Sequence, residues 1–248
     1  EYTQVAMVTA CIAMTRAVEA MGLHADMTAG LSLGEYCAIA AAGGMCDMDA
    51  VRTVRSRGIF MEHAAPEGTG AMSAVLGLDA SVIEEVLDGR EGVSIANYNC
   101  PGQIVITGQA EAVAKAGEAL KEAGARRVLP LKVSGPFHSP MMRPAGEELA
   151  KVFAGVSMNP LKLPYVANIN AEVITDCSKI EELLVAQVSG SVRWQQSVET
   201  MIREGVDTFI EIGPGKTLTG FLRKIDKNVK SYHIGSWEEA VQVCEELK

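Results

Sequence analysis

The sequence predicts an α/β fold in which a core with a mainly parallel sheet is interrupted by a smaller inserted domain. Two observations support this prediction. Through most of the 248 residues, short apolar runs alternate with helical patterns, which is typical of parallel strands covered by helices. Between residues 68 and 133 the order changes to strand, helix, strand, strand, helix, strand. This second order predicts an independent α+β domain.

Glycine and proline mark the boundaries of the insert. Pro66, Gly68 and Gly70 follow the first core segment, and Gly135-Pro136 precedes the second. We therefore expect a core of residues 1–67 and 134–248 around an insert of residues 68–133. The order of elements in the insert is ferredoxin-like, and about 65 residues suffice for it.

The core is expected to begin with a helix at Thr3–Met21 that is apolar on nearly every face and therefore buried. A strand at His24–Gly30, a sharp turn and a helix at Leu33–Ala42 follow. Gly213-Pro214-Gly215 is expected to lead into a last long helix. The other core elements are predicted helices at 49–63, 139–153, 179–189 and 194–204, and strands at 164–168 and 207–212.

Composition excludes several classes of function. The net charge of −9 disfavours nucleic acid, whose binding depends on phosphate contacts. No apolar run reaches about 18 residues, so no membrane span is expected. The six cysteines include no C-x-x-C pair and no histidine cluster, which argues against a metal site and favours a reducing compartment. With no secretory signal in these residues, we expect a cytoplasmic protein.

Ser32 is the candidate nucleophile. Gly30-Leu31-Ser32-Leu33-Gly34 matches G-x-S-x-G between a predicted strand and helix. Such a turn presents the serine hydroxyl clear of the sheet, and the following helix directs free N–H groups at the developing oxyanion. The alternative is an ordinary glycine-rich turn.

His138 is the candidate general base among four histidines. His24 opens the strand that leads to Ser32, about 20 Å away at ~3.3 Å per residue. His63 points roughly 240° away from Arg57 on the same helix at ~100° per residue, and His233 lies in a predicted strand. His138 stands in a loop before a helix, where catalytic groups often occur. A solvated or capping histidine remains the alternative.

Five motifs in order resemble the malonyl-CoA:acyl-carrier-protein transacylase family. They are Gly30–Glu35, Arg57, the Asn97–Gln103 segment, Gly135–Ser139 and Glu211–Gly215. The resemblance extends from Thr3-Gln4 to the end of the chain. It implies an α/β-hydrolase-like core with a ferredoxin-like insert, in agreement with the division predicted above.

The resemblance also implies catalytic roles. Ser32 resembles the nucleophile and His138 the general base. The backbone carbonyl of Gln187 resembles the group that orients the histidine in place of an aspartate. The Leu33 N–H resembles one oxyanion donor. A carbonyl can select the histidine tautomer, although it stabilises an imidazolium less than a carboxylate does.

The remaining implied roles concern the substrate. Arg57 resembles the arginine that grips the malonyl carboxylate, which a planar guanidinium can hold through two hydrogen bonds. On spacing alone, Arg57 would be an ordinary surface arginine. Asn97 and Gln103 resemble polar residues of the cleft, and Phe137 resembles a bulky neighbour of the base that favours malonyl over branched units.

The implied reaction is ping-pong transfer of malonyl from malonyl-CoA to the phosphopantetheine thiol of acyl carrier protein, in fatty-acid biosynthesis. It needs no metal and no cofactor, and a monomer is expected. Because carrier proteins of this kind are acidic, a local basic patch should bind them. The candidate patches are Lys121, Arg126, Arg127 and Lys132 in the insert, and Arg223, Lys224, Lys227 and Lys230 near the end.

Three alternatives stay open at this point. A serine hydrolase or esterase would use water and need no carboxylate clamp. A polyketide-pathway acyltransferase would share the chemistry. A protein without activity would only bind a carrier or synthase partner.

The sequence departs from the family pattern at two places. Leu31 replaces a common histidine, and the family's opening Phe-Pro-Gly-Gln-Gly segment, whose glutamine completes the oxyanion hole, precedes the part matched here. We expect that segment to belong to the same polypeptide, outside these residues.

Overall fold

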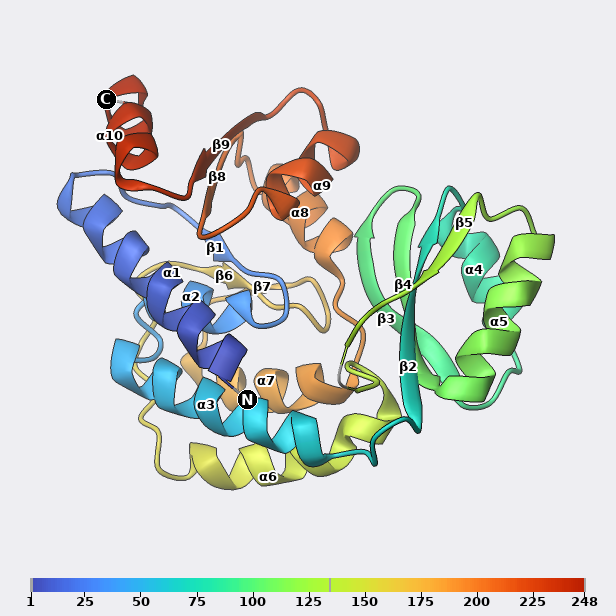
Figure 1. Cartoon of the computed structure of the whole chain (residues 1–248). Coiled ribbons are helices and arrows are strands. Elements are labelled where there is room, and N and C mark those ends of the chain that lie inside the picture. Colours follow the sequence, from blue (N-terminus) through green and yellow to red (C-terminus); the bar gives the residue numbers. More distant parts are fainter. Residues whose placement is uncertain (1, 134, 248) are drawn as a thin grey trace.

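The computed structural model describes residues 2–133 and 135–247, which form three sheets surrounded by helices (Figure 1). The predicted core comprises residues 1–67 and 134–248. Three of these four boundary residues, at positions 1, 134 and 248, lie outside the described residues. The α/β class predicted from the sequence is confirmed, because helices and strands alternate along the chain and parallel strand pairs occur in the core.

The first part of the core contains α1 (Tyr2–Ala20), β1 (Thr28–Ala29), α2 (Gly34–Ala41) and α3 (Asp47–His63). The second part contains η1 (Pro140–Met142), α6 (Arg143–Phe153), β6 (Tyr165–Val166), β7 (Val173–Ile174), η2 (Cys177–Lys179), α7 (Ile180–Ser189), α8 (Trp194–Arg203), β8 (Thr208–Ile212), α9 (Thr217–Ile225), β9 (Lys230–Ile234) and α10 (Trp237–Glu246). Ser139 caps η1, because its hydroxyl oxygen accepts a hydrogen bond from Met141 N.

The strands of the core form two small sheets among the described residues. One sheet has the order β1-β6-β7, with β1 parallel to β6 and β6 antiparallel to β7. The other pairs β8 with β9 in parallel. The predicted strand at His24–Gly30 is reduced to Thr28–Ala29, and β7 was not predicted.

A four-stranded unit separates the two parts of the core along the chain. It contains β2 (Gly70–Leu76), α4 (Ala80–Leu87), β3 (Val93–Cys100), β4 (Gln103–Gln109), α5 (Ala110–Glu122) and β5 (Arg127–Pro130). The strands are antiparallel in the order β3-β4-β2-β5. The unit has its own apolar core, which includes Val75, Ile83, Ile106 and Leu120. Figure 1 shows it beside the larger part of the molecule.

One backbone connection joins the unit to the core close to the C-terminus of α7. Tyr98 N donates to Val192 O, and Val192 N donates to Ala96 O. β3 therefore anchors the segment that follows α7. The end of α7 also carries Gln187, one of the predicted site residues.

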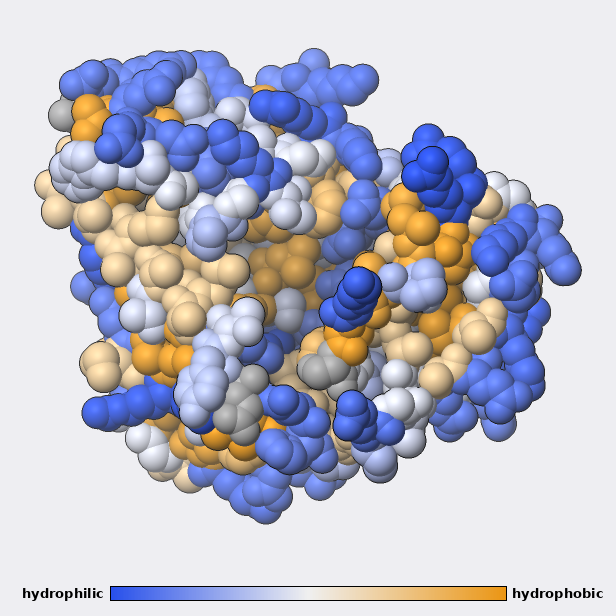
Figure 2. All heavy atoms as spheres, viewed as in Figure 1, coloured by the Kyte–Doolittle hydropathy of each residue, from blue (hydrophilic) through white to orange (hydrophobic). Residues whose placement is uncertain are grey.

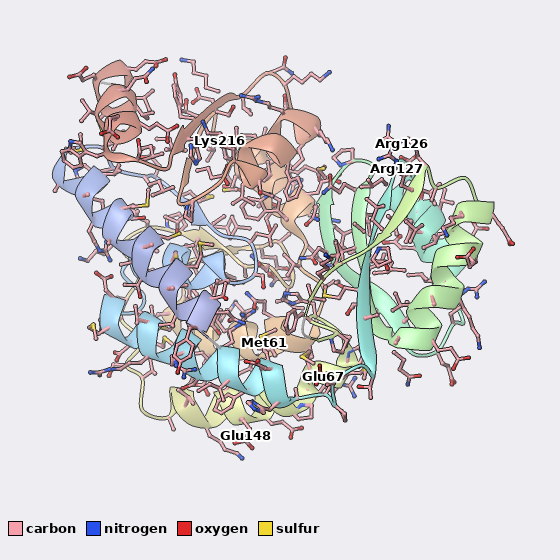
Figure 3. All side chains as sticks on the ribbon, viewed as in Figure 1. Met61, Glu67, Arg126, Arg127, Glu148 and Lys216 are labelled. Carbon is pink, nitrogen blue, oxygen red and sulfur yellow. The ribbon has the colours of Figure 1, made fainter. Side chains whose placement is uncertain are left out.

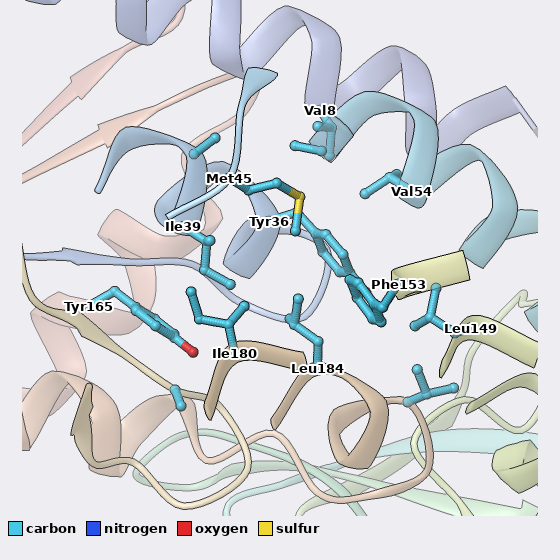
Figure 4. Packing of buried hydrophobic residues seen from close by; sticks show 14 of the residues in the cluster. Val8, Tyr36, Ile39, Met45, Val54, Leu149, Phe153, Tyr165, Ile180 and Leu184 are labelled. Atoms are coloured by element: carbon cyan, nitrogen blue, oxygen red, sulfur yellow. The ribbon is translucent and has the colours of Figure 1, made fainter. Parts of the chain in front are cut away.

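The largest apolar cluster lies between α1, α2, α3, α6 and α7 (Figure 4). Tyr36 and Ile39 of α2 are fully buried there, and they pack with Leu149 of α6 and Leu184 of α7. The short helix α2 is therefore enclosed by apolar side chains. This packing holds its N-terminus, and the turn before it, in one position.

Two predictions about the core helices are wrong. In α1, Val8, Ile12 and Val18 are buried, but Met7 is 37% exposed, and Figure 2 shows apolar side chains exposed over this helix. An apolar residue on every face does not itself determine which faces are covered. The helix expected after Gly215 is α9, which ends at Ile225 and is not the last; the strand predicted at His233 is present as β9, and α10 follows it.

Candidate active site

Ser32 lies in a tight turn at the N-terminus of α2. Its φ of +50° is in the left-handed region, which costs a non-glycine residue about 1–2 kcal/mol. Gly30 allows the turn to close, since a Cβ there would overlap the carbonyl group of Gly34. Ser32 N donates to Asn168 Oδ1 at 2.5 Å, and Asn168 Nδ2 donates to Gly30 O at 2.8 Å. Asn168 thus holds both sides of the turn.

His138 meets Ser32 from the loop before η1. Its Nε2 is 2.7 Å from Ser32 Oγ, and its Nδ1 is 2.9 Å from the backbone oxygen of Gln187. A carbonyl oxygen can only accept, so Nδ1 carries the proton and Nε2 is free to accept the serine proton. Burial, together with the nearby charge of Arg57, lowers the pKa of His138 to about 4. The imidazole is therefore neutral at pH 7.

Arg57 of α3 reaches the same hydroxyl. It is only 2% exposed. Its NH2 is 3.1 Å from both Ser32 Oγ and Gln187 Oε1, and its NH1 donates to Gln4 Oε1 at 2.6 Å. Burial lowers the pKa of Arg57. Among the described residues, no carboxylate lies within ion-pair distance of it.

Gln187, near the end of α7, contacts Ser32, His138 and Arg57. Besides its backbone bond to His138, its Nε2 donates to Ser32 O at 2.9 Å and to Glu35 Oε2 at 2.7 Å. Its Oε1 accepts from Arg57. The resemblance assigns a role to the carbonyl only, so the side chain is a further part of the site.

Three more residues were missed by sequence reasoning. Gln4 and Asn168 gave no local signal, because they meet the site across 53 and 136 positions of sequence. Glu35 is completely buried, although it comes directly after the G-x-S-x-G segment. A carboxylate three residues after the nucleophile, at the start of an apolar helix, was the available signal.

Leu33, Asn97 and Phe137 were also predicted to belong to the site, and each lies in a different element or loop. Leu33 N donates no hydrogen bond within the described part of the chain, and it lies at the N-terminus of α2. Asn97 is 8% exposed and lines a cavity of about 1110 Å³ beside Gly30 and Leu31. Phe137 packs on Met72 and Val105 of the four-stranded unit.

Gln103, the other predicted cleft residue, makes its side-chain hydrogen bond to α9. It opens β4 after the turn at 101–102, and its Oε1 accepts from Lys224 Nζ of α9 at 3.1 Å. No hydrogen bond joins it to the other predicted site residues in the described ranges. The Pro-Gly turn places it at the end of the β3–β4 hairpin.

Residues 2–133 and 135–247 contain no group of three or more histidine, cysteine, aspartate or glutamate side chains arranged to hold a metal. None of the described helices is long and apolar enough to cross a membrane.

A serine on a strained turn, a neutral buried histidine and a buried arginine at the same hydroxyl can form and hold an anionic acyl ester, which is acyl-transfer chemistry. The acyl transferase domain family matches residues 1–243. The chain belongs to this family and, within it, to the malonyl-CoA:acyl-carrier-protein transacylases.

Individual relatives support the assignment. The chain is 45% identical to the malonyl CoA-acyl carrier protein transacylase of Bacillus subtilis over 249 residues, covering 99% of this chain and 78% of the relative. A crystal structure of the Clostridium perfringens transacylase matches with a TM-score of 0.96 at 40% identity, over 99% and 78% of the two chains. A malonyl-transacylase solved with a type II PKS acyl-carrier protein matches with a TM-score of 0.93 at 39% identity, over 98% and 80%.

Proposed function

We propose that this chain transfers the malonyl group of malonyl-CoA to the phosphopantetheine thiol of acyl carrier protein, through a malonyl ester on Ser32. Arg57 carries the proposal. A buried guanidinium without a carboxylate partner is unfavourable, and this one is directed at the oxygen that would carry the acyl group. The malonyl carboxylate supplies the missing anion.

The loading step follows from the hydrogen bonds of Ser32. His138 Nε2 takes the Ser32 proton as Oγ attacks the thioester carbonyl. The Leu33 N–H, at the N-terminus of α2, stabilises the oxyanion in this proposal. His138 then gives the proton to the departing CoA thiolate, so that malonyl remains on Ser32 with its carboxylate at Arg57.

The second step runs the same chemistry in reverse. The carrier's thiol gives its proton to His138 and attacks the malonyl ester, and Ser32 Oγ leaves with that proton. Gln187 O, in the last turn of α7, supports the transient imidazolium. The negative end of a helix dipole there adds to the effect of the carbonyl.

The arrangement of elements supports a finer description of the fold. We assign residues 1–67 and 134–248 to an α/β-hydrolase-like core and residues 68–133 to a ferredoxin-like insert. The order β3-β4-β2-β5 with two helices supports the second part. The short parallel pairs of the core support the first.

Several properties belong to the same proposal. The enzyme acts on malonyl-CoA without a metal or other cofactor, in the cytoplasm and as a monomer. Its partner is an acyl carrier protein. Relatives named for this activity favour it over a serine hydrolase or a binding protein without activity. Because one similar transacylase was solved with a polyketide carrier, carriers of both pathways should be compared as acceptors.

Intact-mass measurement after mixing with malonyl-CoA tests the function. The chain should gain one malonyl group on the peptide containing residues 30–35, and Ser32→Ala should gain none. Transfer of label to the carrier protein then tests the second step. Labelling that persists in Ser32→Ala would mean that another residue forms the ester.

A further inference from the structure

Glu35 is a buried carboxyl that the mechanism above does not use. It stands on the first turn of α2 and is 0% exposed. Its Oε2 accepts hydrogen bonds from Gln187 Nε2 at 2.7 Å and from Asn168 N at 3.3 Å. Within the described residues its Oε1 has no hydrogen-bond partner. Burying a carboxyl group costs free energy unless hydrogen bonds compensate for the lost water. The two hydrogen bonds that Oε2 accepts therefore point to a specific role for Glu35.

Both residues that contact Glu35 also hold the backbone of Ser32. Asn168 Oδ1 accepts from Ser32 N, and Gln187 Nε2 donates to Ser32 O. A left-handed serine persists only where its surroundings determine its conformation. The two restraints on either side of Ser32 therefore meet at one oxygen atom of Glu35.

The same oxygen, together with Ser32 O, determines which way the Gln187 carboxamide points. Glu35 Oε2 accepts from Asn168 N and Gln187 Nε2, so the proton of the neutral carboxyl belongs on Oε1, and Oε2 takes the NH2 side of Gln187. Gln187 Oε1 is then left to face Arg57, as observed. The reversed carboxamide would place an N–H donor against the guanidinium. Glu35 thus acts on the arginine through Gln187.

We propose that Glu35 is a positioning residue, whose Oε2 holds Asn168 and Gln187 so that the Ser32 turn and Arg57 stay in register. The inference rests on the proposed malonyl transfer only for its second part, the alignment of Arg57. The first part concerns the reactivity of Ser32 toward any acylating or phosphonylating reagent.

Three substitutions separate positioning from simple stabilisation. Glu35→Met fills similar volume without an acceptor. Glu35→Asp keeps the carboxyl but is one methylene shorter, so it cannot reach both partners. Glu35→Gln keeps a carbonyl oxygen at full length, and burial raises the pKa of Glu35 to about 8, so a neutral side chain is a fair mimic at pH 7.

Two quantities are measured for each variant, after circular dichroism has shown that it is folded. The first is labelling of Ser32 by a neutral fluorophosphonate, which needs only the nucleophile and the base. The second is the ratio of malonyl to acetyl loading from the two CoA thioesters, which reports on Arg57. A purely structural role would not change that ratio.

Glu35→Met and Glu35→Asp should each lower both quantities about tenfold, the effect of losing one or two hydrogen bonds in a site of this kind. Glu35→Gln should keep both the labelling rate of Ser32 and the malonyl-to-acetyl ratio at the values of the parent. The proposal is overturned if a folded Met or Asp variant matches the parent in either quantity, or if Glu35→Gln is as impaired as Glu35→Met. If the parent itself takes no malonyl, the proposed function fails, while the fluorophosphonate rate still decides the role of Glu35.

Discussion

The guanidinium of Arg57 lies 3.1 Å from the hydroxyl oxygen of Ser32, although 25 residues and a helix boundary separate them in sequence. The arginine is buried, and the described residues offer it two glutamine oxygens and a serine hydroxyl in place of a carboxylate. A charge held so close to the nucleophile distinguishes between acyl groups, because only an acyl group with its own carboxylate can neutralise it.

Arg57→Ala should therefore reduce malonyl loading and spare acetyl loading. Loss of one partner from a buried charged pair costs about 2–5 kcal/mol, or roughly 30- to 5000-fold. The check is the rate of acyl-enzyme formation from malonyl-CoA and acetyl-CoA, measured side by side. Arg52→Ala, an exposed arginine on the same helix, is the matched control and should change neither rate. Equal losses toward both substrates would assign Arg57 to the fold alone.

The pKa of His138 predicts an unusual pH profile. A base with the ordinary histidine pKa of about 6.5 would lose roughly tenfold in rate between pH 7 and pH 5.5. His138 has a pKa lowered to about 4, so it remains unprotonated across that range. Labelling of Ser32 by a neutral fluorophosphonate should stay nearly constant from pH 7 to pH 5 and fall as the pH approaches 4.

Stability sets the lower limit of that experiment. Because the folded-state pKa of His138 is depressed, its contribution to stability is complete above about pH 6.5 and is lost as the pH falls toward 4. Circular dichroism at each pH confirms that the chain is still folded. A tenfold loss of labelling in the folded chain at pH 5.5 would contradict a buried neutral base.

Gly30 and Gly34 make a matched pair for testing the turn. A Cβ on Gly30 would overlap the carbonyl group of Gly34 and lie 2.7 Å from Glu35 N, whereas a Cβ on Gly34 meets nothing within 4 Å. Gly30→Ala should lower the melting temperature by several degrees, since overpacking costs about 1–3 kcal/mol and each kcal/mol is worth roughly 2–4 °C. Gly34→Ala should be neutral or slightly stabilising. Thermal unfolding of the two variants decides the matter.

The sequence was sufficient to predict the parts of the site that depend on local signals. Ser32 follows from glycine spacing between a strand and a helix. Elimination among four histidines made His138 a candidate beside a solvated or capping histidine, and its loop ends at the Ser139 cap of η1. The α/β class followed from alternating patterns. These features are encoded within a few neighbouring residues.

The remaining features depend on contacts between distant segments. Gln4 and the Gln187 side chain meet at Arg57 only after α1, α3 and α7 have packed together. Apolar periodicity could not show that one face of α1 remains exposed. Gln103 was placed in the cleft by resemblance, but its position at the end of a hairpin depends on strand register. Contacts between such distant segments cannot be predicted from the local patterns of a single sequence.

Two basic clusters that are distant in sequence lie next to each other in the fold. Lys224 of α9 donates to Gln103. Gln103 and Arg127 both pair with Leu76, from the two sides of β2. Figure 3 shows Arg126 and Arg127 at the edge of the four-stranded unit, on its side nearer α9. An acidic carrier protein can contact both clusters together. Because the whole chain carries a net charge of −9, binding an acidic partner requires such a local basic surface.

Arg127→Glu and Lys224→Glu should each raise the KM for the carrier protein about tenfold, or ~1.4 kcal/mol, and the effect should shrink with added salt. Malonyl loading from malonyl-CoA should be unchanged, because it does not involve the carrier. The control is Lys151→Glu on α6, a surface lysine that pairs with Glu148 three residues earlier and lies on another side of the molecule, where Figure 3 labels Glu148. Steady-state transfer to the carrier at two salt concentrations distinguishes the cases. An unchanged KM in both variants would place the carrier on a different surface, and an equal rise in Lys151→Glu would show that only net charge matters.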